Sequence, residues 1–263
     1  LFGGIVQMVL LFATADKQFW KEIFSLKRHH TKVKRFFELI WPTFLSSTLL
    51  QINMLVGLLL ASFITGAVSI LYFAERVYFL PLSLIAISIG TVLIPNLANS
   101  LRVKDMTTAL DVQWQAYRYS ILTILPATFC LVALSEEVIE ILYQRGEFTY
   151  ESTRQTSFVL KLFLIGLPFA TLVKILTPYF FAIEKPKIPL KVSLYTVIFN
   201  LALTIWLFQY INFIAIPIGL SISACLNLLL LLIEHKKQNF FKLDSMVTNY
   251  FLKYLLLSVL LFL

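Results

Sequence analysis

One stretch of this sequence, from Leu39 to Leu101, limits the possible folds more than any other. It contains only two charged residues, the adjacent pair Glu75 and Arg76. The apolar segments on either side of this pair are long enough to cross a bilayer. Lipid offers no water to solvate a charge, so an ion pair buried in such a run is costly. We therefore look first at Glu75 and Arg76 for function.

Apolar runs of this kind recur along the whole chain. Of its 263 residues, 59% are hydrophobic and only 14% are charged, and the mean hydropathy is +0.84. A soluble helical domain needs polar faces with a period of about 3.6 residues, which most of these segments lack. The sequence therefore predicts an all-α fold, a polytopic bundle of transmembrane helices.

Polar residues, glycines and prolines divide the chain into membrane spans. We expect spanning helices at residues 39–63, 67–97, 119–134 and 155–183, and two more within residues 192–233. The last segment carries no charge and is too long for one span, so we place a break near Asn212. Pro42 then falls in the first turn of its helix, where proline is tolerated.

Residues 135–154 are the most polar segment between spans. Ser135 is a plausible N-cap, and two glutamates follow it in what would be the first helical turn. Apolar residues then recur at helical spacing. The pattern predicts a short helix at the membrane interface over residues 135–146, ending at Gly146.

The charges of the loops alternate along the chain. The loops at 16–35, 102–118, 184–191 and 234–248 are rich in Lys and Arg, whereas 135–154 carries five Glu against two Arg. By the positive-inside rule the basic loops are cytoplasmic. The net charge of +8 comes from these short loops, which argues against nucleic-acid binding.

No motif of a soluble enzyme is present. The sequence has no Walker A, GxGxxG or HExxH motif and no set of nucleophile, base and acid, so we expect no enzyme, no cofactor and no metal. His29, His30 and His235 fall in basic loops and are expected to be solvated. Cys130 and Cys225 fall in apolar segments and are expected to be small buried hydrophobes.

Arg76 has two interpretations. In the first, the external loop extends to Arg76 and the charged pair lies among the headgroups, since residues 77–101 alone can span a bilayer. In the second, the helix begins earlier and Arg76 lies about 12 Å deep, facing a water-filled cavity where it binds an anion. Guanidinium groups bind phosphate oxygens through two hydrogen bonds. Ser69, two turns earlier on the same face, could add a hydroxyl.

Lys174 lies deep in the fourth span, between Pro168 and Pro178. Its side chain could extend to the nearer interface, or it could be a second cation in a cavity lined by a kinked helix. Lys161, Asn53 and Gln51 are weaker candidates. Asn and Gln in a span more often join helices by hydrogen bonds than bind a ligand.

Several short motifs occur in order between about residues 35 and 235. They are Ala61-Ser62-Phe63 with Gly66; Tyr72, Ala74-Glu75-Arg76-Val77-Tyr78 and Leu80-Pro81-Leu82; Ile89 to Pro95; Leu142 to Thr149; and Leu172 to Pro178 with Phe180-Phe181-Ala182 and Lys187-Ile188-Pro189. In these motifs the chain resembles the bacterial lipid II flippase family, MurJ/MviN.

The resemblance implies a flippase/exporter fold of the MOP superfamily, with two helical lobes around a central cationic cavity. Residues 1–13 would end the first lobe and residues 14–35 would be a basic cytoplasmic linker. Residues 36–235 would form the second lobe of about six helices, and residues 236–263 would hold a loop and the start of a further helix.

The resemblance also implies a function and a site. The protein would move undecaprenyl-diphosphate-linked peptidoglycan precursor (lipid II) across the bacterial cytoplasmic membrane by alternating access, with Arg76, Ser69, Lys174 and Glu75 binding the substrate. Its partners would be this anionic lipid, membrane lipids and the first lobe. The alternatives are an exporter of polysaccharide lipids or drugs in the same superfamily, and a membrane scaffold that contacts partners through residues 135–146.

Overall fold

The structure is a computed structural model that describes residue 6, residues 30–103 and residues 105–237. The predictions for residues 1–13, for most of the basic linker and for residues 238–263 lie outside these ranges. The chain divides into two compact units, Leu1–Pro42 and Thr43–Leu263. Except for the limits of α3, the description below concerns the second unit.

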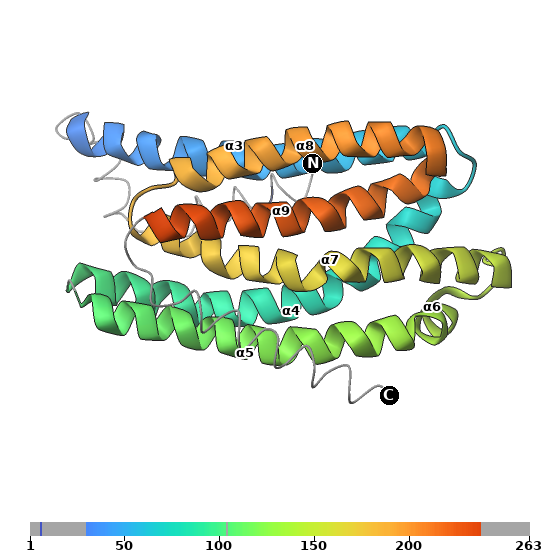
Figure 1. The fold of residues 1–263 in the computed structure, drawn as a ribbon, viewed down its shortest axis with the longest axis horizontal. Helices are drawn as coiled ribbons and strands as arrows, with labels where there is room; N and C mark the ends of the chain where they lie inside the picture. The colour runs from blue at the N-terminus through green and yellow to red at the C-terminus, as the bar shows by residue number, and fades with distance from the viewer. Residues whose placement is uncertain (1–5, 7–29, 104, 238–263) are drawn as a thin grey trace. The chain divides into compact units, whose positions relative to one another are not determined.

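All the regular elements within the described ranges are helices (Figure 1). They are α3 (His30–Ala61), α4 (Ala67–Arg102), α5 (Met106–Ala133), α6 (Ser135–Tyr143), α7 (Tyr150–Ala182), α8 (Lys187–Ile211), the 3-10 helix η2 (Asn212–Ile214) and α9 (Ala215–Lys237). The predicted break near Asn212 is confirmed. Asn212 adopts φ +53°, which ends α8 before η2.

Four stretches of the described chain are long and apolar enough to cross a membrane. They are Ala67–Leu97, Thr107–Ala133, Tyr150–Ala182 and Lys187–Lys237. The last contains both α8 and α9, which η2 separates. The predicted all-α bundle of membrane-spanning helices is therefore confirmed in fold class.

Most helices extend further into the basic segments than we predicted. Of the segments expected as loops, 102–118 is helical from Met106 and 184–191 is helical from Lys187. Likewise α3 already begins at His30, so Pro42 lies inside the helix and not in its first turn. The apolar pattern marks only the part of a helix that is in contact with lipid, and Lys, Arg and Gln are good helix formers beyond it.

The short helix predicted after residue 134 exists but is shorter than residues 135–146. It ends at Tyr143, and the chain then turns through Gly146 with φ +59°. The prediction that Ser135 is the N-cap is wrong, because Leu134 holds that position and Ser135 is the first residue of the helix. Ser135 is fully buried, so its side chain packs inward at the junction of α5 and α6.

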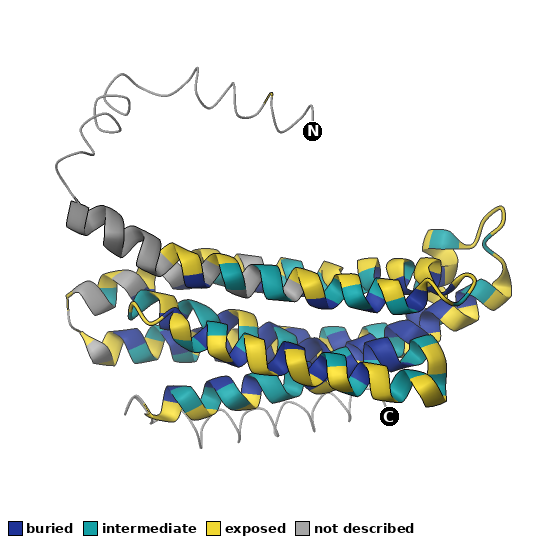
Figure 2. Cartoon of the chain, turned by 90° about the horizontal axis from the view of Figure 1, so that it is seen from above, coloured by how far each residue is buried: buried dark blue, intermediate teal, exposed yellow. Residues whose placement is uncertain are grey.

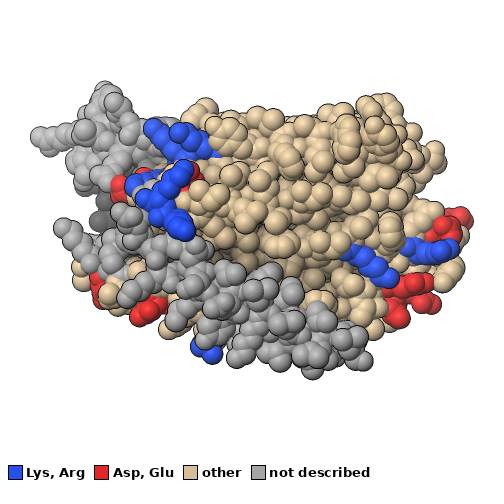
Figure 3. All heavy atoms as spheres, in the orientation of Figure 1, with Lys and Arg blue, Asp and Glu red and all other residues tan. Residues whose placement is uncertain are grey.

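The helices of the second unit begin and end at two opposite ends of the bundle. In Figure 1, α4 and α7 begin at the end where α6 lies, whereas the α4–α5 and α7–α8 connections lie at the opposite end. The middle of the bundle is largely free of charged side chains in Figure 3, where Lys, Arg, Asp and Glu gather mainly toward the ends. The structure thus places the predicted basic connections 102–118 and 184–191 at one end.

The core lies where α4, α5 and α7 meet. Leu97 of α4, Ile124 of α5 and Leu164 of α7 are fully buried, and Figure 2 shows buried residues concentrated between the helices. Helices in lipid gain little from burying apolar surface, so their packing depends on close approach. Gly166 of α7 supplies such an approach, because a Cβ there would lie 2.8 Å from Ser221 Cα of α9.

We therefore expect Gly166→Ala to destabilise the bundle by about 1–3 kcal/mol, since the α9 backbone must move to admit the methyl group. Gly90→Ala in α4 is the matched control, because a Cβ at Gly90 meets nothing within 4 Å. Its higher helix propensity should stabilise α4 by about 1 kcal/mol. The free energy of unfolding in detergent micelles is measured for both variants. Equal values would contradict the close contact between α7 and α9.

Asp105 starts α5 by accepting hydrogen bonds from Thr108 N at 3.1 Å, Thr108 Oγ1 at 2.6 Å and Thr107 Oγ1 at 2.7 Å. These bonds lower the pKa of its carboxyl group to about 2. The usual value is about 3.9, so the ionised form stabilises the folded state fully above about pH 4. This contribution is lost as the pH falls through about 2.

The prediction is that Asp105→Ala lowers the thermal midpoint at neutral pH, because the cap is lost. Asp105→Asn keeps a capping oxygen without the charge and serves as the control. The difference between wild type and Asp105→Asn should disappear as the pH falls from about 4 to about 2. A difference that does not change with pH over this range would contradict the assignment.

Candidate functional site

Glu75 and Arg76 lie in the third turn of α4, and their side chains diverge. Ala74 and Val77 on either side of the pair are fully buried, whereas Arg76 is exposed and Glu75 is half-buried. Successive residues of a helix differ by about 100° in direction, so neighbours in sequence face different surroundings. The helix begins at Ala67, so Arg76 does not lie in a loop, and the depth of the pair in the membrane stays a prediction.

The guanidinium group of Arg76 lies over the ring of Tyr72, with Cζ 4.6 Å from the ring centroid. This is cation–π geometry, which holds the guanidinium plane against one turn of the same helix. A stacked guanidinium still has its N–H donors pointing outward in the plane of the group. Arg76 therefore presents donors on an exposed face of α4.

Aromatic rings connect this face to α6. The Phe73 ring lies 5.8 Å from that of Tyr72, 4.7 Å from that of Tyr143 and 5.3 Å from that of Phe148. Burial raises the pKa of the Tyr143 hydroxyl, although the charge of Arg76 lowers it in part. Tyr143 is therefore neutral at physiological pH and close enough to Arg76 to be affected by its charge.

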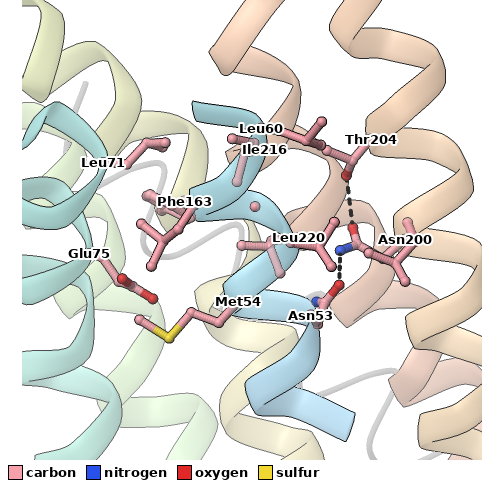
Figure 4. A pocket seen from close by; sticks show the side chains of 14 residues that line it. Asn53, Met54, Leu60, Leu71, Glu75, Phe163, Asn200, Thr204, Ile216 and Leu220 are labelled. Atoms are coloured by element: carbon pink, nitrogen blue, oxygen red, sulfur yellow. Dashed lines mark hydrogen bonds between the residues drawn. The ribbon is translucent and has the colours of Figure 1, made fainter. Parts of the chain in front are cut away.

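Glu75 faces a small cavity on another side of α4 (Figure 4). The cavity has a volume of about 30 Å³, which is room for about two water molecules. Its walls come from α3, α4, α7, α8 and α9. The lining residues are Asn53, Met54, Val56, Gly57, Leu58, Leu60, Leu71, Glu75, Phe163, Asn200, Leu201, Thr204, Ile216 and Leu220.

Asn200 is the centre of a buried polar network on the far wall of this cavity. Its Nδ2 donates to Asn53 Oδ1 at 2.7 Å, and its Oδ1 accepts from Thr204 Oγ1 at 3.4 Å and from Ser223 Oγ at 3.1 Å. The network joins α3, α8 and α9. Asn53, a weaker candidate ligand in the sequence, thus makes the helix–helix hydrogen bond that is usual for such residues.

The other predicted site residues lie apart from the cavity. Ser69 is exposed on α4, two turns before Arg76, and Lys174 is exposed on α7. The rings of Tyr78 and Phe163 lie 5.6 Å apart, which sets the register of α4 against α7. Lys174 follows Phe163 by 11 residues, so it lies about 16 Å further along the bundle than this contact. Arg76 and Lys174 are therefore at different depths.

Two minor predictions are corrected by the packing. His235 is 1% exposed and not solvated, because α9 continues to Lys237 and brings the His235 ring 4.5 Å from that of Tyr179. Cys130 is exposed and not buried, since it lies on an outer face of α5, while Cys225 is half-buried. Within the described ranges no group of His, Cys, Asp and Glu is arranged to hold a metal ion.

Sequence reasoning missed Asn200, Thr204 and Ser223. The available signal was their spacing, because Asn200 and Thr204 lie one helical turn apart in a charge-free span. A single polar residue in such a span suggests an interhelical hydrogen bond, but only the fold shows that Asn53, Thr204 and Ser223 all bond to Asn200. Tyr72 was noted only as part of a motif, and its contact with Arg76 was not predicted.

Long apolar helices with an arginine and hydroxyl groups on an exposed face define a polytopic membrane protein. Comparison with known proteins gives the family. The family model "Lipid II flippase MurJ" matches residues 1–263, so the chain belongs to the MurJ family.

Individual relatives agree with this assignment. Probable lipid II flippases MurJ from Rickettsia prowazekii and Rhizobium meliloti are 34% and 32% identical to this chain, over 97% and 88% of its length. A solved structure described as lipid II flippase MurJ in an inward closed conformation is also similar, with a TM-score of 0.69 and 25% identity. The match covers 90% of this chain and 56% of the chain in that structure. The chain spans about half the length of the relatives, 50% and 43% for the two flippases named.

We expect Asn200→Leu to destabilise the bundle by about 1–3 kcal/mol, because it leaves buried partners on α3, α8 and α9 without their hydrogen bonds. Asn227→Leu is the control. Asn227 is half-buried and donates one hydrogen bond, to Thr196 Oγ1 at 3.3 Å, so its loss should cost only about 0.6 kcal/mol. The free energies of unfolding of the two variants are measured in detergent micelles. An equal loss of stability in both would contradict the central place of Asn200 in the network.

Proposed function

We propose that the protein carrying this chain moves lipid II, an undecaprenyl-diphosphate-linked peptidoglycan precursor, across the bacterial cytoplasmic membrane by alternating access. The support from relatives is family membership and the printed names of proteins that are about one-third identical over most of this chain. The chain corresponds to about half of those proteins. Transport is therefore proposed for the complete protein.

The observation that carries the proposal is the exposed guanidinium of Arg76 within an apolar span. An arginine that faced acyl chains here would be costly, so this face of α4 is expected to meet water, an anion or another protein segment. The donors of Arg76 lie in one plane against Tyr72, and this geometry suits the oxygens of a phosphate or diphosphate. A dianionic headgroup crossing the membrane needs such a partner.

The remaining predicted residues take separate places in the proposal. Ser69 would donate its hydroxyl to the same headgroup from two turns nearer the start of α4. Lys174 would be a second cation, met at another depth as the headgroup moves along the bundle. Glu75 would act from behind this face, because its side chain enters the cavity between α4 and the α3–α8–α9 group.

We also propose the orientation of the chain in the membrane. The connections 102–118 and 184–191 would be cytoplasmic, as would the basic segments 16–35 and 234–248, following the positive-inside rule. The acidic α6 region would then be external. The support within the second unit is that the two basic connections lie at the end of the bundle opposite α6.

The alternative functions predict different behaviour. An exporter of drugs or polysaccharide lipids would share the fold but would not need a phosphate-binding arginine at this position. A scaffold that uses α6 for partner contacts would not need its rings to reach the binding face. The contacts of Tyr143 and Phe148 with Phe73 connect α6 to the turn that carries Arg76, which favours a role for α6 in the site.

The test is Arg76→Ala in the full-length protein, with binding of lipid II measured in nanodiscs. A hydrogen bond to a charged group contributes about 1.5–3 kcal/mol, so its loss should weaken the affinity for lipid II roughly 10- to 100-fold. The rate of translocation should fall with the affinity. Arg76→Lys keeps the charge but not the planar donor pair, so it should recover binding only in part.

Arg154→Ala is the matched control, because Arg154 is also exposed but is the fifth residue of α7. It should bind like wild type. If Arg76→Ala binds lipid II as tightly as Arg154→Ala does, while both variants fold, the headgroup does not use Arg76 and the proposed site is wrong.

A further inference from the structure

Glu75 occupies an unusual place among the acidic residues that the structure describes. It lies within the apolar stretch Ala67–Leu97, eight residues after the start of α4. Its side chain enters the cavity of Figure 4, whereas the side chain of Arg76 leaves α4 on the exposed face. In the described ranges no salt bridge joins the two residues. The adjacent charges of the sequence are therefore not a closed ion pair.

The wall opposite Glu75 is polar but uncharged. It presents Asn53, Asn200 and Thr204, which are bonded to one another. Asn53 Oδ1 and Asn200 Oδ1 both already accept hydrogen bonds. The rest of the lining is apolar, with Met54 and Phe163 beside the carboxylate in Figure 4.

The titratable groups around Glu75 are few. The residues that α3, α7, α8 and α9 contribute to the cavity lining include no Lys, Arg, His, Asp, Glu, Cys or Tyr. On α4 itself, Arg76 attracts the charge of Glu75, and Tyr78 is close enough to be affected by that charge. Arg76 is the only cation in this set, and it is stacked against Tyr72 on the other face.

A carboxylate in such a cavity is costly as an anion, because few water molecules fit and no residue in the described ranges donates a hydrogen bond to it. We propose that Glu75 is a proton-binding site, neutral as a carboxylic acid when the cavity is closed and ionised when it opens to water. The exchange is balanced: the carboxylate accepts the proton of a hydronium ion and leaves a water molecule, and the reverse occurs on opening.

A proton fits this cavity better than a metal ion does. A metal cation needs several oxygen ligands, and the amide oxygens nearby are engaged with donors. A space of about 30 Å³ admits a hydrogen-bonded water but no hydrated ion. The described residues also contain no cluster of His, Cys, Asp and Glu that could hold a metal ion.

The position of the cavity links proton binding to the conformation of the bundle. The cavity lies where α4 and α7 meet α3, α8 and α9, so neutralising Glu75 favours closure of this junction and ionisation favours its opening to water. Proton binding would then bias one conformation of the bundle. This inference goes beyond the proposed function, which does not include any coupling ion, and it does not require that Arg76 bind lipid II.

The experiment measures the carboxyl group directly by infrared spectroscopy of the full-length protein in lipid nanodiscs without substrate. A protonated carboxyl C=O band that shifts in D₂O should be present at neutral pH and absent in Glu75→Gln. Glu140→Gln, at an exposed position of α6, is the matched control and should keep the band. Glu75→Asp should show a shifted band, which supplies a second variant if Glu75→Gln does not fold.

Two outcomes would overturn the proposal. The first is the absence of a protonated band at neutral pH, or a band that persists unchanged in Glu75→Gln and Glu75→Asp. The second is loss of the band at constant pH when sodium replaces choline in the buffer, which would show that the carboxylate binds a metal ion instead. Because no lipid II is present, neither outcome depends on the result for Arg76→Ala.

Discussion

The interior of a bilayer contains no water, so each polar group in the bundle needs a partner within the protein. Asn200 shows how this constraint is met, because its amide bonds to residues on α3, α8 and α9. Gly219 makes room for this network, since a Cβ there would lie 2.8 Å from Asn200 Oδ1. Hydrogen bonding and close packing thus occur at the same contact and hold these three helices together.

The same constraint gives Arg76 and Glu75 their different settings. The charge of Arg76 is met by the Tyr72 ring and by whatever polar group covers the exposed face. Among the residues that the structure describes, no comparable partner meets the charge of Glu75, which is why we infer that a proton neutralises it. Glu75 and Arg76 are neighbours in α4 and point in directions about 100° apart, so a movement of α4 at the cavity also moves the cation.

Much of the fold followed from hydropathy and loop charge. The break at Asn212 and the short helix that starts at Ser135 were both predicted, because a bilayer requires long apolar segments with short polar connections. The helix ends were less accurate, since nothing in the apolar pattern marks where a polar helix ends. His235 illustrates the error, because it was expected in a solvated loop and is instead buried against Tyr179.

The candidate site was likewise predicted only in part from the sequence. Residue order alone indicates a charged pair inside an apolar run, because such a pair stands out against its neighbours whatever the fold. The directions of the two side chains depend on the helix phase and on which faces α7, α8 and α9 cover. The meeting of Asn53 with Asn200, residues 147 positions apart in the chain, depends on the packing of whole helices. Contacts over such separations leave no local pattern in a single sequence, and only the tertiary structure decides them.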